Sequence, residues 1–79
     1  MLRKTKHMKL RILEKRVETS LKEAGLNAEI VDTGVIRVPV TNKRGFSGDV
    51  IRYTLDEIGG IEYEIYTGPT YHNIYLISY

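Results

Sequence analysis

Hydrophobic residues recur every three or four positions in the first third of the chain, at Leu10, Leu13, Val17, Leu21 and Ala24. This is the period of an amphipathic helix that turns one face to a core. Gly25 is suited to a left-handed helix end, and Leu26 stands where a Schellman motif places a hydrophobic residue. The pattern predicts a helix over about residues 5–24. Before or at the start of this helix, residues 1–8 can form a flexible basic arm.

Beyond Leu26 the pattern changes to short runs typical of strands, separated by turn residues. The strands are expected at about 28–32, 35–40, 49–57, 61–67 and 74–78. Thr33-Gly34 and Gly59-Gly60 are suited to tight hairpins, and residues 68–73 to a loop. Short connections favour sequential antiparallel neighbours. The predicted fold class is therefore α+β, with one N-terminal amphipathic helix packed on an antiparallel meander of about five strands.

Alternation along the strands assigns one side of each to the helix. The expected inward residues are Ile36, Val38, Val40, Ile51, Tyr53, Leu55, Ile61, Tyr63 and Ile65. Pro39 lacks a ladder donor, so its strand should lie near an edge or break there. The last strand is apolar on both faces, which leaves an outward patch of Tyr66, Tyr75, Ile77 and Tyr79. We expect this patch to be an interface, most simply that of a homodimer.

Composition limits the kinds of site that the chain can build. Its 79 residues include no cysteine and two well-separated histidines, so no disulfide, thiolate zinc site or other metal centre is expected, and no cofactor. We expect one small domain with a thin core, for which oligomerisation would supply stability. No apolar run resembles a signal peptide or a membrane span, and a cytoplasmic location is expected.

Charge is unevenly distributed along the chain. Residues 1–22 carry eight Lys and Arg against two Glu, a net charge of +6, and residues 23–79 carry −4. On the predicted helix Lys4, Arg11, Lys15 and Lys22 fall on one side as a basic stripe. Cations at a helix N-terminus oppose the macrodipole, which favours a role in binding an external anion such as a nucleic-acid phosphate. The alternatives are a solvated charged face and contact with an acidic protein or membrane surface.

A second basic element lies in the turn between the second and third predicted strands. Lys43, Arg44 and Phe46 place two cations beside an aromatic ring, a combination that can hold a phosphate and stack on a base. The alternative is a glycine-rich hairpin with solvated charges. No Gly-Lys-Ser/Thr ending follows, so this turn is not a Walker loop.

Few residues are arranged for catalysis. His7 and His72 have no carboxylate partner at a recognisable spacing. Glu62 and Glu64 share a strand face with Tyr66, which makes that face acidic and unsuited to phosphate. The chain is therefore expected not to be an enzyme.

These patterns together predict a small non-enzymatic binding module. The leading hypothesis is contact with nucleic-acid phosphates through the basic stripe and the Lys43-Arg44-Phe46 tip. The alternative is a protein-interaction module or a small protein inhibitor, which uses the basic helix, the tyrosine-rich sheet patch or both.

Overall fold

The computed structural model describes the backbone of residues 2–40 and 47–78, and the side chains of residues 10–40 and 47–77. Its elements are α1 (Leu2–Glu23), β1 (Glu29–Asp32), β2 (Val35–Pro39), α2 (Ser47–Ile58), β3 (Glu62–Thr67) and β4 (Tyr71–Ser78). The strands form one antiparallel sheet in the order β1-β2-β4-β3. The predicted α+β class is confirmed, with two helices and four strands.

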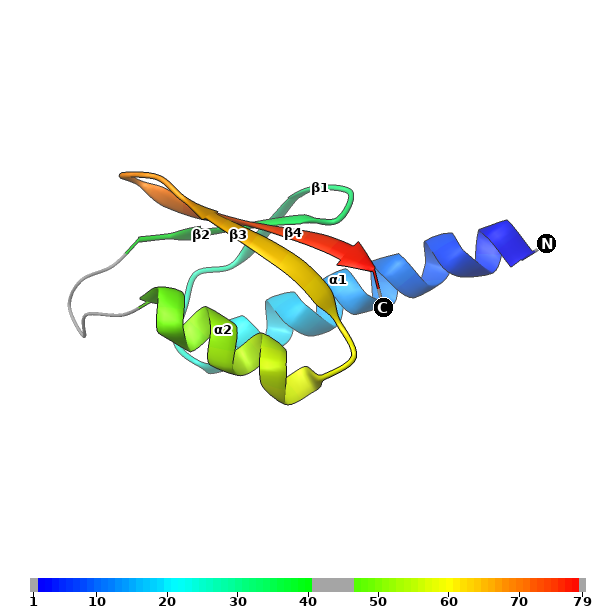
Figure 1. Cartoon of the computed structure of the whole chain (residues 1–79), viewed down its shortest axis with the longest axis horizontal. Helices are drawn as coiled ribbons and strands as arrows, with labels where there is room; N and C mark the ends of the chain where they lie inside the picture. Colours follow the sequence, from blue (N-terminus) through cyan, green and yellow to red (C-terminus); the bar gives the residue numbers. More distant parts are fainter. Residues whose placement is uncertain (1, 41–46, 79) are drawn as a thin grey trace.

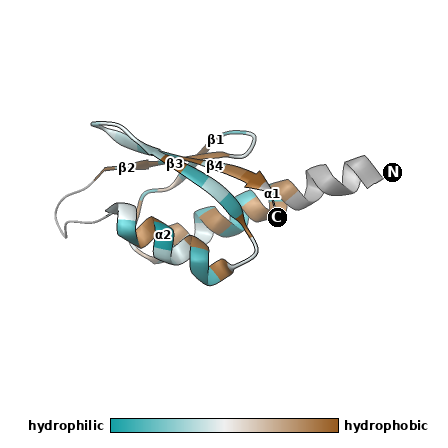
Figure 2. Ribbon diagram, viewed as in Figure 1, coloured by the Kyte–Doolittle hydropathy of each residue, from teal (hydrophilic) through white to brown (hydrophobic). Residues whose placement is uncertain are grey.

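Both helices lie on the same side of the sheet (Figure 1). The apolar side chains between the helices and the sheet form the core. The core consists of Val17, Leu21, Ala28, Ile36, Val38, Ile51, Leu55, Ile74 and Leu76. The hydrophobic stretches of β2 and β4 lie at the centre of the sheet (Figure 2). The other side of the sheet is covered by no element in the described part of the chain.

The predicted end of the first helix is confirmed in detail. Gly25 has φ +95°, and its N–H donates to the Lys22 carbonyl at 2.9 Å. The Leu26 N–H donates to the Leu21 carbonyl at 3.0 Å, which completes a Schellman motif. Leu26 packs on the core, so the end of α1 is fixed to the body of the protein. The helix starts at Leu2, three residues earlier than expected.

The strand predicted over residues 49–57 is wrong, because this segment is helix α2. Its apolar positions fit both the two-residue period of a strand and the 3.6-residue period of a helix. The strand period selects Ile51, Tyr53 and Leu55 as inward residues, whereas the helix period selects Ile51 and Leu55 without Tyr53. In α2 Ile51 and Leu55 are buried one turn apart, and Tyr53 is 68% exposed. Asp49 in the first turn complements the helix dipole and favours the helix.

Gly59 and Gly60 take positive φ values of +79° and +68°, as the hairpin prediction required, but they serve another purpose. The Gly59 N–H donates to the Leu55 carbonyl at 3.1 Å. The pair therefore ends α2 and leads into β3, instead of joining two strands.

The predicted meander order is also wrong. Because α2 replaces a strand, β2 pairs with β4, and β3 lies at the edge. β4 begins at Tyr71, earlier than expected, since only residues 68–70 form the turn. β2 ends at Pro39, as its missing donor led us to expect, and the next N–H, that of Val40, donates to the Thr70 carbonyl at 2.9 Å.

Alternation correctly predicted the two sides of the central strands. Ile36 and Val38 of β2 are buried, and so are Ile74 and Leu76 of β4. The residues between them point to the side of the sheet opposite the helices. No helix in the described part of the chain is long and apolar enough to cross a membrane.

Candidate functional site

The uncovered side of the sheet collects exposed aromatic and aliphatic side chains. We call it the open sheet face and define it by the outward residues Arg37, Glu64, Tyr66, Tyr71, Tyr75 and Ile77, with Val31 and Glu29 on β1 and Glu62 on β3 at its margins. Tyr66 is 57% exposed and Ile77 is 55% exposed. Tyr66, Tyr75 and Ile77 were predicted to form this patch, and the structure brings them to one face. Tyr79 lies outside the described residues.

Two tyrosines form the centre of the open sheet face. The rings of Tyr66 and Tyr75 meet edge to face, with centroids 5.4 Å apart. Tyr75 lies between Val35 and Glu64 in the strand register. The Tyr66 hydroxyl donates to the Glu64 carboxylate at 2.5 Å, and this hydrogen bond is the main reason why the pKa of Tyr66 is raised. The carboxylate is thereby held close to both rings.

Arg37 supplies a cation to this face. Its guanidinium lies over the Tyr71 ring, 4.6 Å from the centroid, and one of its terminal nitrogens is 3.8 Å from the Glu29 carboxylate. Its Nε is buried without a hydrogen-bond partner. Arg37 is thus held between an aromatic ring and a carboxylate within the sheet face.

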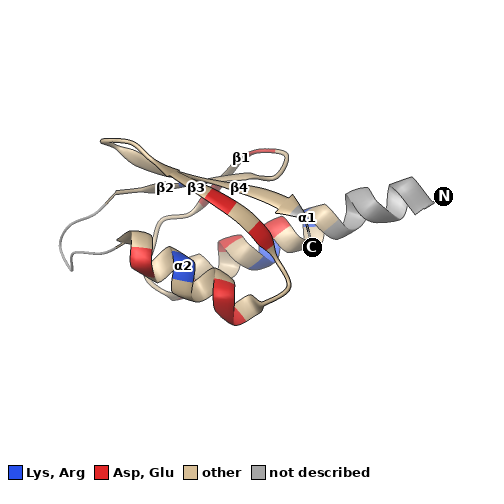
Figure 3. Cartoon of the chain, in the orientation of Figure 1, with Lys and Arg blue, Asp and Glu red and all other residues tan. Residues whose placement is uncertain are grey.

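The charges on the open sheet face are mainly negative. Among the described outward residues, Glu29, Glu62 and Glu64 outnumber Arg37. The two acidic positions of β3 appear as separate red bands on the ribbon of this edge strand (Figure 3). The sequence predicted this acidic character correctly, and such a face repels phosphate.

The predicted basic stripe divides into two different halves on α1. In the C-terminal half Glu18 lies between two of the lysines, 3.4 Å from Lys15 and 3.7 Å from Lys22. Residues 14–23 contain three Lys and Arg and three Glu, whereas residues 1–13 contain five Lys and Arg and no acid. Arg11 is exposed, and the side chain of Lys4 lies outside the described residues. The excess positive charge therefore belongs to the N-terminal half of the helix.

The predicted tip of Lys43, Arg44 and Phe46 lies outside the described residues. The end of β2 and the start of α2, which flank it, lie at the end of the molecule opposite the N-terminus of α1 (Figure 1).

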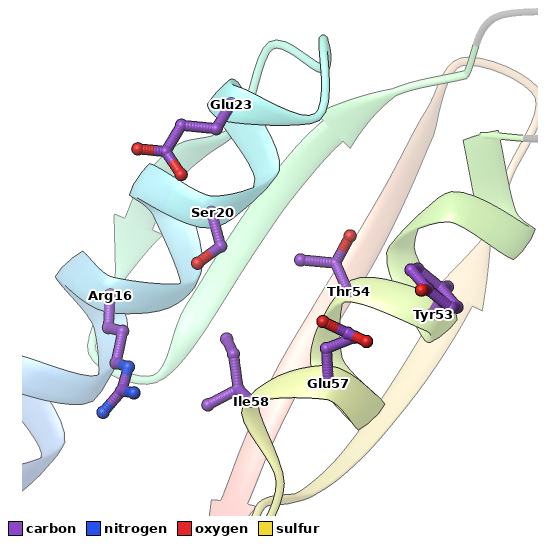
Figure 4. A pocket seen from close by; sticks show the side chains of 7 residues that line it. All are labelled: Arg16, Ser20, Glu23, Tyr53, Thr54, Glu57 and Ile58. Carbon is purple, nitrogen blue, oxygen red and sulfur yellow. The ribbon is translucent and has the colours of Figure 1, made fainter.

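A groove of about 310 Å³ separates the two helices on the other side of the molecule (Figure 4). It is lined by Arg16, Ser20 and Glu23 of α1 and by Tyr53, Thr54, Glu57 and Ile58 of α2. A smaller apolar hollow of about 240 Å³ continues it past Arg16 and Ile58 toward Ile61. The groove carries charges of both signs.

A buried polar cluster joins α2 to the sheet. The two ring nitrogens of His72 lie 2.7 Å from the Ser47 hydroxyl and 2.8 Å from the Thr67 hydroxyl. His72 is 4% exposed and Ser47 is 5% exposed. Burial lowers the pKa of His72, and the nearby Arg52 lowers it further. A serine beside a histidine can serve catalysis, but here both are enclosed, so the cluster fastens the start of α2 to the β3–β4 hairpin.

Sequence reasoning missed this cluster because its members are 25 and 5 residues apart and come from different elements. His72 was placed in a loop, and it belongs to β4. No group of three or more potential metal ligands occurs among the residues whose positions are described.

Comparison with known proteins adds no relative. No family model matches the chain, and neither a curated protein nor a solved structure is significantly similar to it.

Proposed function

We propose that the chain is a small non-enzymatic binding module that holds a protein partner on its open sheet face. One observation carries this proposal. Of the seven large hydrophobic side chains that are exposed in the described residues, five project from this face: Val31, Tyr66, Tyr71, Tyr75 and Ile77. The other two, Ile12 and Tyr53, lie on different helices.

The composition of the open sheet face suits protein recognition. Tyrosines combine a large apolar surface with a polar hydroxyl and are enriched at the centres of protein interfaces. A contiguous apolar patch on a small protein also exposes surface that association would remove from water. The carboxylates of Glu62 and Glu64 oppose the approach of a phosphate backbone to the same surface. These features favour a protein partner over a nucleic acid on this side of the molecule.

A comparative pull-down tests the proposal. Tagged wild-type chain, a Tyr66→Ser/Tyr75→Ser variant and a Tyr53→Ser variant are incubated with extract from the organism that encodes the chain. Tyr53 is an exposed tyrosine on α2 and serves as the matched control. We expect a protein that wild type and Tyr53→Ser retain equally and that the double variant loses. Retention of the same proteins by all three chains would refute the open sheet face as the binding surface.

Nucleic-acid binding is the second candidate, and the charge of α1 favours it. Five Lys and Arg in residues 1–13, with no acid among them, give the N-terminal half of the helix a net charge of +5. The first turns of this half extend beyond the sheet (Figure 1). Several cations along one helix can neutralise phosphates and release counterions, with little base readout.

The two halves of α1 provide a matched test of this candidate. Fluorescence anisotropy with labelled duplex DNA, single-stranded DNA and RNA should show binding that weakens steeply between about 50 and 200 mM salt. Arg11→Glu should weaken it more than Lys15→Glu, because Lys15 already interacts with Glu18. No binding at the lower salt concentration to any of the three would eliminate this candidate.

A further inference from the structure

We infer that the occupant of the open sheet face is a cationic protein segment, in which apolar side chains are flanked by Lys or Arg. This inference rests on the proposed function and names the class of partner. It follows from the arrangement of charges around the aromatic centre of the face, and from a cation that the chain itself already holds there.

Carboxylates lie at both edges of the open sheet face, with the aromatic rings between them. Glu62 and Glu64 belong to the edge strand β3, and Glu29 belongs to the opposite edge strand β1. The charge of Arg37 is directed toward Glu29, 3.8 Å away, on the β1 side of the face, whereas the carboxylate of Glu64 lies on the β3 side, opposite Tyr75. A partner with an apolar centre and positive flanks would complement this pattern.

The position of Glu64 makes the complementarity specific. Glu64 lies directly opposite Tyr75 in the strand register, and the Tyr66 hydroxyl holds its carboxylate. A Lys or Arg that enters beside Tyr75 would meet this carboxylate and an aromatic ring together. The chain shows that such an arrangement fits on this sheet, since Arg37 lies 4.6 Å above the Tyr71 ring and beside Glu29.

The same charges argue against a second copy of the chain as the occupant. Two open sheet faces placed against each other would bring together six carboxylates and two guanidinium groups, because each face carries Glu29, Glu62, Glu64 and Arg37. Like charges brought into one interface oppose association. A homodimer through this face is therefore less favourable than a complex with a cationic partner.

Three short peptides of equal length test the inference. They share one pattern of leucines and carry Lys, Gln or Glu at every other position, so that charge alone differs. We expect the lysine peptide to bind at least roughly tenfold more tightly than the glutamine peptide, and the glutamate peptide not to bind. NMR shifts should be confined to amides of β3, β4 and the adjacent part of β2.

Charge-reversal variants provide the control. Glu64→Lys should weaken binding of the lysine peptide by roughly tenfold, because an attraction becomes a repulsion. Glu57→Lys reverses an exposed carboxylate on α2, away from the open sheet face, and should change binding less than about twofold. Equal losses in the two variants would indicate a general charge effect and would overturn the inference.

The possible failures are distinguishable. If the glutamine and lysine peptides bind this face equally, the face binds protein without selecting cations, and only the inference fails. If light scattering shows a dimer that Tyr75→Ser abolishes, the occupant is a second copy, and the inference is overturned. If no peptide changes the amide NMR signals of β3 or β4 and the pull-down does not depend on Tyr66 and Tyr75, both the inference and the proposed function fail.

Discussion

Tyr66 and Tyr75 meet edge to face across β3 and β4, with ring centroids 5.4 Å apart and ring planes at 77°. They are diagonal neighbours, because Tyr66 lies opposite Asn73, two residues before Tyr75. Such a contact contributes about 0.5–1.5 kcal/mol beyond the area that it buries. It also restricts the rotation of both rings, so binding of the proposed partner would cost less side-chain freedom.

The open sheet face should contribute little to folding. Ile77→Ser changes a 55% exposed side chain and should alter the free energy of unfolding by less than about 0.5 kcal/mol. Ile74→Ala, on the buried side of the same strand, should cost about 2–5 kcal/mol because it removes core contacts and leaves a cavity. Urea denaturation measures both. A large loss in Ile77→Ser would mean that this face is part of the folding core.

His72 should make stability depend on pH. Its folded pKa lies below the unfolded value of 6.5, so the unfolded chain binds the proton first as the pH falls. The stabilisation is complete above about pH 6.5 and is lost as the pH falls toward the folded pKa, with a slope of at most about 1.4 kcal/mol per pH unit. Denaturation between pH 5 and 6.5, roughly, isolates this slope from carboxylate titration. The slope should vanish in His72→Gln and persist in His7→Gln.

Glu14 should stabilise the contact between α1 and the β1–β2 turn. It is buried, and its carboxylate accepts a hydrogen bond from the Gly34 N–H. Glu14→Ala leaves that N–H without this acceptor and should cost about 1–3 kcal/mol in the free energy of unfolding. Glu14→Gln retains an acceptor oxygen and should lose less. Equal stability of wild type and Glu14→Ala in chemical denaturation would contradict this role.

Gly59 should be required at the end of α2. Its φ of +79° is strained for an L-residue, so Gly59→Ala should cost about 1–2 kcal/mol although its added Cβ meets only an ordinary contact, 3.9 Å from the Asp56 carbonyl oxygen. Gly68→Ala is the control, because Gly68 does not have positive φ and a Cβ there meets only an ordinary contact at 3.8 Å. Thermal unfolding of the two variants distinguishes conformational strain from loss of space. Similar unfolding temperatures of the two variants would show that stability does not require a residue suited to positive φ at position 59.

Elements that depend on local patterns were predictable from the sequence. The end of α1 follows from Gly25 and Leu26, and the β1–β2 hairpin follows from Thr33-Gly34. The outward direction of Tyr75 follows from simple alternation along β4. Each of these features is decided by residues close in sequence, so tertiary contacts are not needed to infer it.

Features that depend on distant contacts were not predictable. Ile51 and Leu55 are inward in both a strand and a helix, so their spacing alone could not exclude a strand. The error in the predicted sheet order followed from this one. Because the segment forms α2 and not a strand, β2 pairs with β4. The contact of His72 with Ser47 joins the start of α2 to β4 across 25 residues, and no local pattern indicates it.

Hydroxyl-radical footprinting of tyrosine tests most directly whether the open sheet face binds a protein partner. Oxidation of each tyrosine is measured by mass spectrometry, first in the purified chain and then in extract from the organism that encodes it. Tyr66 and Tyr75 should become protected in the extract, while Tyr53, which is 68% exposed on α2, should remain unchanged after correction for radical scavenging. Protection of Tyr53 with unchanged oxidation of Tyr66 and Tyr75 would contradict the account and would place the partner on the helical side.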